Sequence, residues 1–520
     1  MSSLGLFALP VGRRPLANQD EARFALLARE GVEHGHWLLP RVRGVIYLNK
    51  PPLYFWTVGL LALPFGVVSD ATAPLCSIGC ALLTLLAVIA LGRRQWDDEV
   101  GLAAGLVLAT APYFYFMSHQ VLSDMMMTAW LAWALYFLLA ARRAPAPVRP
   151  LIGFYLCLGG ALATKGPAAL MGLAAALAVA VLDHGWRGLG WLRLPMGLGI
   201  LALCTAPWVL PYLLQSERSY VGGVVVGHYG EWYFRDKPGS RLAAFGDNLG
   251  RFLPWTVFLV AGLWWWWRDR DARRRPLLAW TLVIAVAVSL SGEQRARYFV
   301  PVLPSLAVLV AEVLVRAPRE GGHLGRRVVL AAYGVLLLAA VGAVGYLLWP
   351  AVAGGAGPDV FVPAPGAERW LVSLFMLAGL VAALVILARK GSGFAATMAV
   401  ATALGGILLV EGWGYPTRYA ERANIRGFTA AMAAKLSPAE RILAYPDANL
   451  YYDFYLRRPV RELSTPAALQ SALASPEPGD VLLMRAATWS AVPPEAAARW
   501  DVRLTDRVGG HTMVLLAPRP

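Results

Sequence analysis

Long runs of apolar residues, separated by short polar segments, dominate the pattern along this chain. A helix needs about twenty consecutive apolar residues to cross a bilayer. On this measure we predict twelve membrane-spanning helices, near residues 73–91, 100–118, 121–141, 151–164, 166–182, 195–214, 252–267, 277–291, 298–315, 328–349, 370–388 and 394–410. Hydropathy alone leaves one more apolar segment, 53–69, undecided. The pattern therefore predicts a polytopic α-helical membrane protein.

The composition agrees with this interpretation. Hydrophobic residues make up 58% of the chain, charged residues 15%, and the mean hydropathy is +0.53, whereas charged residues make up about 25% of an ordinary soluble protein. The net charge of +15 comes largely from bases in short loops, so it indicates membrane topology and not nucleic acid binding. The four cysteines lie inside apolar runs and predict neither a disulfide framework nor a zinc site; they are Cys76, Cys80, Cys157 and Cys204.

Basic residues are distributed unevenly between the loops. They concentrate near residues 93–94, 142–149, 187–193, 268–275, 316–327 and 389–390, which the positive-inside rule assigns to the cytoplasm. The other loops, and everything after Glu411, then face the periplasm or cell exterior. This parity makes 53–69 an interfacial helix, with a re-entrant hairpin as the alternative. It also predicts either that the chain begins outside or that a first helix is truncated before Arg13.

Residues 412–520 are more polar than the rest of the chain. Short strands are predicted at 441–445, 481–484 and 512–516, with helices at 422–436 and 466–473. We therefore predict a small soluble α/β domain at 412–520, after a membrane domain at 1–411 whose residues 13–72 form an outward loop with interfacial helices. An aromatic run could stack on sugars, although a hydrophobic core is favoured; it comprises Tyr445, Tyr451, Tyr452, Phe454 and Tyr455.

Charged groups at membrane depth are costly and are kept mainly where they have a partner or a function. The candidates on the predicted outward face are Asp20, Glu21, Lys50, Asp124, Lys165, His228, Arg295 and Arg297, with Tyr298 beside the last. Asp20 and Glu21 begin an amphipathic segment, where acids also complement the helix dipole. Lys50 precedes Pro51-Pro52 on an extended stub, where its ammonium suits a phosphate or ordinary anionic lipid.

Two further candidates mark the ends of apolar segments. Asp124 opens one segment, where it could simply cap the helix. Lys165 lies where Gly166-Pro167 interrupts a long apolar run, and a lysine there is costly unless it is paired. We therefore favour a functional role for Lys165.

The remaining candidates follow later spans. Arg295 and Arg297 carry guanidinium groups that bind phosphate bidentately, although an ion pair with Glu293 is the alternative. His228 is a lone histidine in the loop 215–248, and such a residue is more often structural than a metal ligand.

These motifs, taken in their order and spacing, resemble a known family. They are Asp20-Glu21 with Arg23, Lys50-Pro51-Pro52-Leu53 with Trp56, residues 118–124, Thr164-Lys165-Gly166-Pro167, and Arg297-Tyr298 with Pro301 and Pro304. The chain is similar to the bacterial aminoarabinose transferase and protein O-mannosyltransferase superfamily, which has the GT-C fold. The resemblance implies a multi-pass glycosyltransferase of the bacterial inner membrane, with thirteen spans and with its active site and C-terminal domain facing outward.

The resemblance also implies transfer of a sugar from a polyprenyl phosphate to an acceptor, which is lipid A, another glycolipid, a polysaccharide or a protein. Asp20 matches the family's catalytic carboxylate, which takes the acceptor's proton. Lys50 and Arg297 would offset charge on the departing lipid phosphate, which Tyr298 would also contact. The substrate-binding set is completed by Asp124 and Lys165 in the sugar cavity and by Glu21 and Arg295.

The chain departs from the aminoarabinose branch at two places. Asn49 and Gly227-His228 stand where that branch has an acid and an acid-histidine pair. A metal held by His228 is therefore doubtful, and a divalent metal is the one cofactor left open. A transporter or lipid flippase is the competing function, but the chain lacks two matching halves and has a large outward loop followed by an outer domain.

Overall fold

The computed structural model describes residues 3–215, 241–291, 295–353, 367–446 and 448–519. It contains two compact units. The first, which we call the helical unit, comprises Met1–Leu9, Leu48–Tyr54 and Leu75–Trp413. The second, which we call the mixed unit, comprises Pro10–Tyr47, Phe55–Pro74 and Gly414–Pro520. The C-terminal segment therefore shares a compact unit with two stretches from the N-terminal region.

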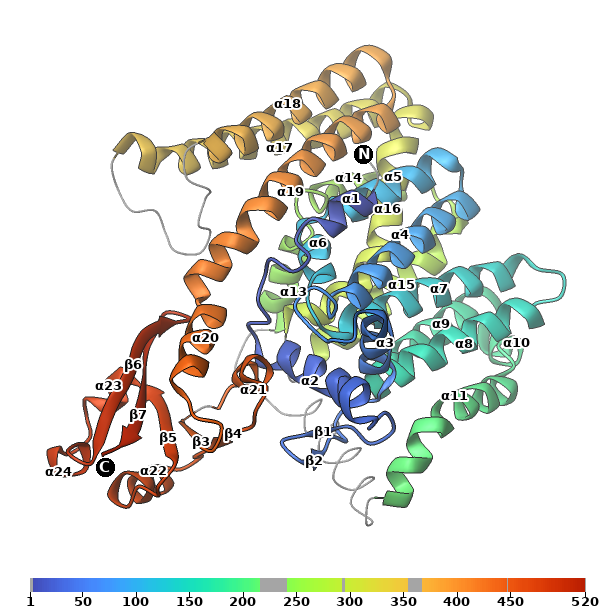
Figure 1. The fold of residues 1–520 in the computed structure, drawn as a ribbon. Helices are drawn as coiled ribbons and strands as arrows, with labels where there is room; N and C mark the ends of the chain where they lie inside the picture. Colours follow the sequence, from blue (N-terminus) through green and yellow to red (C-terminus); the bar gives the residue numbers. More distant parts are fainter. Residues whose placement is uncertain (1–2, 216–240, 292–294, 354–366, 447, 520) are drawn as a thin grey trace. The chain divides into compact units, whose positions relative to one another are not determined.

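Apolar helices build the helical unit (Figure 1). In its N-terminal part they are α1 Ser3–Ala8, α4 Leu75–Gln95, α5 Asp98–Ala109, α6 Pro112–Ser118, α7 Ser123–Arg143, α8 Val148–Lys165, α9 Leu170–His184, α10 Gly188–Trp191 and α11 Leu194–Gln215. In its C-terminal part they are α13 Arg241–Gly250, α14 Val257–Arg268, α15 Arg275–Leu290, α16 Leu303–Glu320, α17 Gly322–Ala353, α18 Ala367–Lys390 and α19 Gly393–Ala423, the last of which continues into the mixed unit. Short 3₁₀ helices occur at η2 Gly166–Ala169, η3 Gly185–Arg187, η5 Ala272–Arg274 and η6 Ala296–Val302.

All twelve predicted spans fall on helices of this unit, although the span 100–118 divides between α5 and α6, and the polytopic α-helical fold is confirmed. Among the described residues, eight helices are long and apolar enough to cross a membrane, or nine if α5 and α6, bent by 68°, form one span. The count is below twelve for two reasons. The stretch Val148–Trp191 is counted once although it carries two predicted spans, and α14 and α15 have only 12 and 16 residues.

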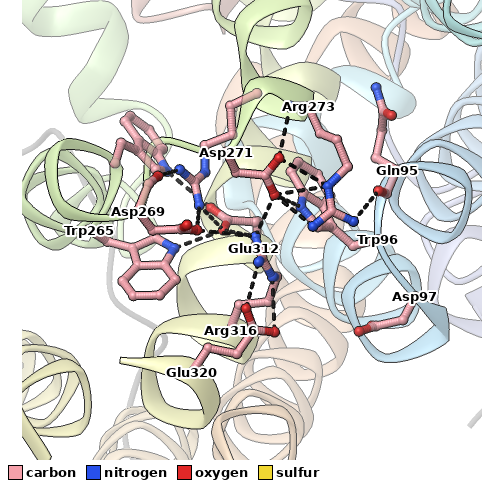
Figure 2. A network of polar contacts seen from close by, with 12 residues as sticks. Gln95, Trp96, Asp97, Trp265, Asp269, Asp271, Arg273, Glu312, Arg316 and Glu320 are labelled. Atoms are coloured by element: carbon pink, nitrogen blue, oxygen red, sulfur yellow. Dashed lines mark hydrogen bonds and ion pairs between the residues drawn. The ribbon is translucent and has the colours of Figure 1, made fainter. Parts of the chain in front are cut away.

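Helix α16 is buried from Leu303 to Pro318, although this stretch carries the charged residues Glu312 and Arg316. Figure 2 shows how its Glu312 is satisfied. One carboxylate oxygen accepts hydrogen bonds from Trp265 Nε1 at 2.8 Å, from Arg274 Nη2 at 2.8 Å and from Arg316 Nη1 at 3.0 Å. The other oxygen accepts from Trp266 Nε1 at 3.0 Å. A fully buried carboxylate is thus surrounded by four donors.

The network extends from Glu312 to the loop between α14 and α15 and to the α4–α5 loop (Figure 2). Arg316 also donates to Asp271 at 3.0 Å, and Asp271 accepts from Trp96 Nε1 at 3.1 Å. Burial favours a raised pKa for Asp271, but hydrogen bonds from Arg273 and Trp96 outweigh it, and the net pKa lies below its usual range. The network therefore ties two loops to the C-terminal end of α16.

The mixed unit combines an open sheet with short helices. Its elements near the N-terminus are α2 Gln19–His34, the hairpin β1 Arg41–Val42 and β2 Val45–Ile46, α3 Leu53–Ala62, which begins in the helical unit, and η1 Leu63–Phe65. With ten residues, α3 is too short to cross a bilayer by itself. Its placement in the interface stays a prediction.

The C-terminal part of the mixed unit contains α20 Ile425–Lys435, β3 Arg441–Tyr445, α21 Leu450–Leu456, β4 Val460–Glu462, α22 Pro466–Ala474, β5 Asp480–Arg485, α23 Ala486–Trp489, α24 Pro494–Ala497, β6 Trp500–Val508 and β7 His511–Pro518. The strand order is β4-β3-β5-β7-β6, with β3 parallel to β4 and β5, and with β7 antiparallel to β5 and β6.

Alternation along the strands places apolar side chains on both faces of this sheet. Ile442 and Ala444 of β3 belong to one core cluster with Phe428 of α20, and Leu443 belongs to the other with Leu469 of α22. The sheet is therefore covered by helices on both faces. This agrees with the predicted small α/β domain.

Strands β3, β5 and β7 and helices α20 and α22 confirm the predicted elements. Strands β4 and β6 and helices α21, α23 and α24 were not predicted. β6 lies at an edge of the sheet, and only its two end residues, Trp500 and Val508, are buried, so its apolar signal is weak. In α21, Tyr452 and Phe454 are buried, which confirms the core interpretation of the aromatic run at these two positions.

Candidate functional site

Asp20 lies in the first turn of α2, in the mixed unit. The helix begins there because Asn18 caps it: the Asn18 side-chain oxygen accepts from the amides of Asp20 at 2.8 Å and Glu21 at 3.2 Å. The Asp20 carboxylate pairs with Arg23 at 2.6 Å, and both side chains are about one quarter exposed, at 23% and 26%. An oriented carboxylate is thus held where a substrate hydroxyl could reach it.

Glu21 has a different environment from its neighbour. It is fully buried and forms a two-point ion pair with Arg14, one bond of which measures 3.0 Å. Burial lowers the pKa of Arg14, but the paired carboxylate outweighs burial, and the net pKa is raised. Glu21 is therefore placed to anchor the chain before α2.

Tyr47 was not singled out from the sequence, although it lies beside the Asp20 and Arg23 pair. The Arg23 guanidinium carbon lies 5.9 Å from the Tyr47 ring centroid. Burial, opposed by Arg23 and reinforced by Asp20, raises the pKa of Tyr47 to about 12. The phenol therefore keeps its proton at neutral pH and can donate a hydrogen bond. In the sequence, Tyr47 is marked only by its position two residues before Asn49, which directly precedes the Lys-Pro-Pro motif.

Lys50 lies in the helical unit, in a bend and not on the extended stub that the two prolines predicted. The side chain is half-buried, while Pro51 and Pro52 are buried and lead directly into α3. Asn49 is exposed beside it. The prolines thus keep Lys50 at the start of the helix.

Three predicted residues of the helical unit lie close together: Asp124, Lys165 and Arg297. The Asp124 carboxylate, 2% exposed at the start of α7, forms an ion pair with Lys165. Its other oxygen lies 3.9 Å from Arg297 Nε. The N-cap of α7 is Leu122, so the carboxylate is directed to these bases and does not serve as the helix cap.

Lys165 is the last residue of α8, and the helix ends there because Gly166 adopts a positive φ of 67°. The Lys165 ammonium lies 4.5 Å from the Tyr298 ring centroid, a cation–π distance. This buried lysine therefore has a carboxylate partner and an aromatic ring beside it, as we expected for a lysine at membrane depth. The cluster Asp124, Lys165, Arg297 and Tyr298 is a buried, positively biased site.

The two remaining predicted residues are Arg295 and His228. Arg295 is exposed at the N-cap of η6, two residues before Arg297. His228 lies outside the described residues, as does Glu293. Within the described part of the chain, no three His, Cys, Asp or Glu side chains gather as metal ligands.

The sequence is similar to known families of lipid-dependent glycosyltransferases. Residues 49–213 match the model of the dolichyl-phosphate-mannose-protein mannosyltransferase family. The undecaprenyl phosphate-alpha-4-amino-4-deoxy-L-arabinose arabinosyl transferase of Erwinia tasmaniensis is 26% identical over 355 residues, 64% of this chain and 62% of the relative. The transferase of the same description from Pseudomonas paraeruginosa is 28% identical over 347 residues, 62% of this chain and 60% of the relative. The matches thus span about three fifths of these relatives.

The fold is similar to that of ArnT from Cupriavidus metallidurans. Its apo structure superimposes with a TM-score of 0.81 at 21% identity, covering 98% of this chain and 96% of that one. Its structure bound to undecaprenyl phosphate gives a TM-score of 0.78 at 22% identity, with 99% and 96% covered.

Proposed function

We propose that this chain, which has the GT-C fold, belongs to the aminoarabinose transferase and protein O-mannosyltransferase superfamily and transfers a sugar from a polyprenyl phosphate to an acceptor hydroxyl. The acceptor is lipid A, another glycolipid, a polysaccharide or a protein. Because Asn49 departs from the aminoarabinose branch, the proposal covers the lipid phosphate of the donor and leaves the sugar open.

The proposal rests on the agreement between the family match and the buried ion pair. The stretch that matches the mannosyltransferase family, residues 49–213, contains Lys50, Asp124 and Lys165. Two of these three residues form a buried ion pair in the structure. Buried charges in a membrane protein are expensive and point to function by default. The undecaprenyl phosphate bound to the ArnT relative supports a polyprenyl phosphate as the lipid.

In the proposed reaction, Asp20 takes the proton of the acceptor hydroxyl. The acceptor oxygen then forms a bond to the anomeric carbon of the sugar, while the bond from that carbon to the phosphate oxygen breaks. Both electrons of the broken bond stay on the phosphate, so negative charge develops on the departing polyprenyl phosphate. Arg23 orients the Asp20 carboxylate from 2.6 Å.

The developing charge on the lipid phosphate needs positive groups that are already in place. We assign this role to Lys50 and Arg297, with Tyr298 donating a hydrogen bond. Arg297 is preferred over Arg295 because its side chain belongs to the buried cluster, whereas Arg295 is exposed. Asp124 and Lys165 shape the cavity for the sugar.

The chain is a multi-span membrane protein, and we propose that its site and C-terminal segment face the periplasm. The support is charge asymmetry: basic residues end α4, α7 and α18, and they follow α14. A lipid-linked donor is then used on the outer side of the inner membrane.

The first test is Asp20→Asn. The amide keeps the size of the carboxylate but does not accept the proton, and losses of 100-fold to 10,000-fold are typical when a general base is removed, on the order of 3–5 kcal/mol. We expect cells with this variant to lack the sugar-bearing product that wild-type cells make. Mass spectrometry of the cell envelope, compared with a strain lacking the gene, measures this.

Glu30→Gln is the matched control, because it removes a carboxylate from the same helix, where Glu30 contacts His34 and His36. It should leave the product at its wild-type level. Both variants should insert in the membrane in equal amounts. A normal product in the Asp20→Asn strain would disprove the role of Asp20.

A further inference from the structure

The chain just before α2 is held by one carboxylate of the mixed unit, that of Asp70. Its Oδ1 atom accepts a hydrogen bond from the Tyr455 hydroxyl at 2.6 Å and lies 3.3 Å from the amide nitrogen of Leu16. The same amide donates to the Tyr455 oxygen at 2.7 Å. Burial and the neighbouring Asp70 raise the pKa of Tyr455, so the phenol keeps the proton that it donates.

Arg426 of α20 completes this arrangement. Its Nε donates to Asp70 Oδ2 at 2.7 Å. Its Nη2 donates to the carbonyl oxygens of Gly12 and Arg14, both at 3.0 Å, and its Nη1 donates to that of Arg13 at 3.4 Å. One guanidinium thus binds three successive carbonyls while it pairs with a carboxylate, and this fixes the path of the backbone.

Only Ala17, Asn18 and Gln19 separate Leu16 from Asp20. Ala17 packs against the core cluster of the C-terminal sheet, and Asn18 is the N-cap of α2. The backbone between the bound amide of Leu16 and the first turn of α2 is therefore short, and it is held in place at Ala17 and Asn18. A shift of residues 12–16 would therefore move Asp20.

Helix α21 binds the same region at two more points. Arg29 of α2 donates to the carbonyl of Phe454 at 3.0 Å, and its guanidinium carbon lies 4.1 Å from the Phe454 ring centroid. Arg43 donates to Asp453 Oδ1 at 2.8 Å and to the Ala448 carbonyl at 2.7 Å. Three successive residues of α21, from Asp453 to Tyr455, thus contact the segment that carries Asp20.

We propose that Tyr455, Asp70 and Arg426 are positioning residues for Asp20, and that α21 serves the reaction by fixing the first turn of α2. This rests on the proposed role of Asp20 as the base. Part of the aromatic run then has a use beyond the core, because the hydroxyl of Tyr455 holds the backbone. A misplacement of about 1 Å in a reacting group costs about 100-fold in rate, so small movements of this turn matter.

The test is Tyr455→Phe, which removes one oxygen and keeps the ring. We expect kcat for sugar transfer to fall at least tenfold, while KM for the polyprenyl phosphate donor stays within twofold, because the groups assigned to the phosphate are elsewhere in the sequence. Asp70→Asn should lower kcat at least as much. Tyr445→Phe, the same change on β3, is the control and should match the wild type.

Hydrogen exchange separates positioning from general loss of stability. In Tyr455→Phe, the amides of residues 12–21 should exchange at least tenfold faster, while peptides from β3 and β5 exchange as in the wild type. An unchanged kcat in Tyr455→Phe would overturn the proposal, and so would faster exchange spread over the whole sheet. Where Asp70→Asn does not fold, Tyr455→Phe alone decides.

The two proposals fail in different ways. If Asp20→Asn transfers sugar at the wild-type rate, then Asp20 is not the base, and the positioning role of the other residues is disproved as well. An inactive Asp20→Asn together with a fully active Tyr455→Phe would overturn only the positioning role.

Discussion

The two lysines of the predicted site lie in different surroundings. Lys165 is 6% exposed, and its charge is shared between Asp124 and the ring of Tyr298. Lys50 is half-buried in a bend before two prolines. A buried charge that leaves its partner for another loses more free energy than a charge near water does. Lys50 is therefore better suited to bind and release a phosphate, and Lys165 to maintain the cluster.

Lys50→Ala should weaken binding of the lipid phosphate about 10-fold to 100-fold, since a hydrogen bond to a charged group contributes about 1.5–3 kcal/mol. Binding of a labelled polyprenyl phosphate to the purified protein measures this. Lys390→Ala, at the exposed end of α18, is the matched control. Equal affinities in the two variants would argue against a phosphate role for Lys50.

At the scale of elements, α16 connects two polar regions of the helical unit. Tyr298 lies in η6 directly before it, and Glu312 and Arg316 lie toward its other end. About 14 Å of helix separates Leu303 from Glu312 at 1.5 Å per residue. The Glu312 network fixes one end of α16 through neighbouring loops (Figure 2). The helix can thus present η6 in one position.

Glu312→Gln should destabilise the protein by about 1.5–3 kcal/mol, because Arg274 and Arg316 lose the buried carboxylate that they share but keep their ion pairs with Asp269 and Asp271. Glu320→Gln on the same helix should cost about 0–1 kcal/mol, since Glu320 is 38% exposed. Thermal unfolding of both variants in detergent gives the comparison. Equal Tm values for the two variants would show that the network does not stabilise the fold.

At the scale of the whole chain, basic residues serve both topology and packing. Arg142 at the end of α7 pairs with Asp183 of α9, and Arg143 donates to the Gln95 side chain at 2.6 Å. Basic helix ends are retained on the cytoplasmic side during insertion. In the proposed orientation, the same residues that set the topology also stabilise the packing of the helices.

The proposed orientation predicts opposite labelling of two cysteine variants. Ser475→Cys, exposed after α22, should react with a membrane-impermeant maleimide in intact spheroplasts. Arg270→Cys, exposed between α14 and α15, should react only after permeabilisation. Cys76, Cys80 and Cys157 are buried and Cys204 is half-buried, so the chain without either substitution is labelled in parallel as the background. The reverse pattern would invert the topology.

Local patterns in the sequence were sufficient for the helices of the twelve predicted spans, for two helices and three strands of the C-terminal segment, and for the residue types of the site. Hydropathy and alternation depend on neighbouring residues, so they survive in any tertiary arrangement. The break at Lys165 was predictable for the same reason, because Gly166-Pro167 ends a helix locally. The resemblance to a family then rested on the order of these local motifs.

Only the tertiary structure decided which residues meet. Asp124 and Lys165 are 41 positions apart, and Leu16 and Tyr455 are 439 apart, so no window of sequence contains either pair. The burial of Glu21 with Arg14, the surroundings of Tyr47 and the donors around Glu312 likewise depend on packing between distant segments. The sequence gives the type of each side chain. Its partner depends on which surfaces pack together when apolar area is buried during folding.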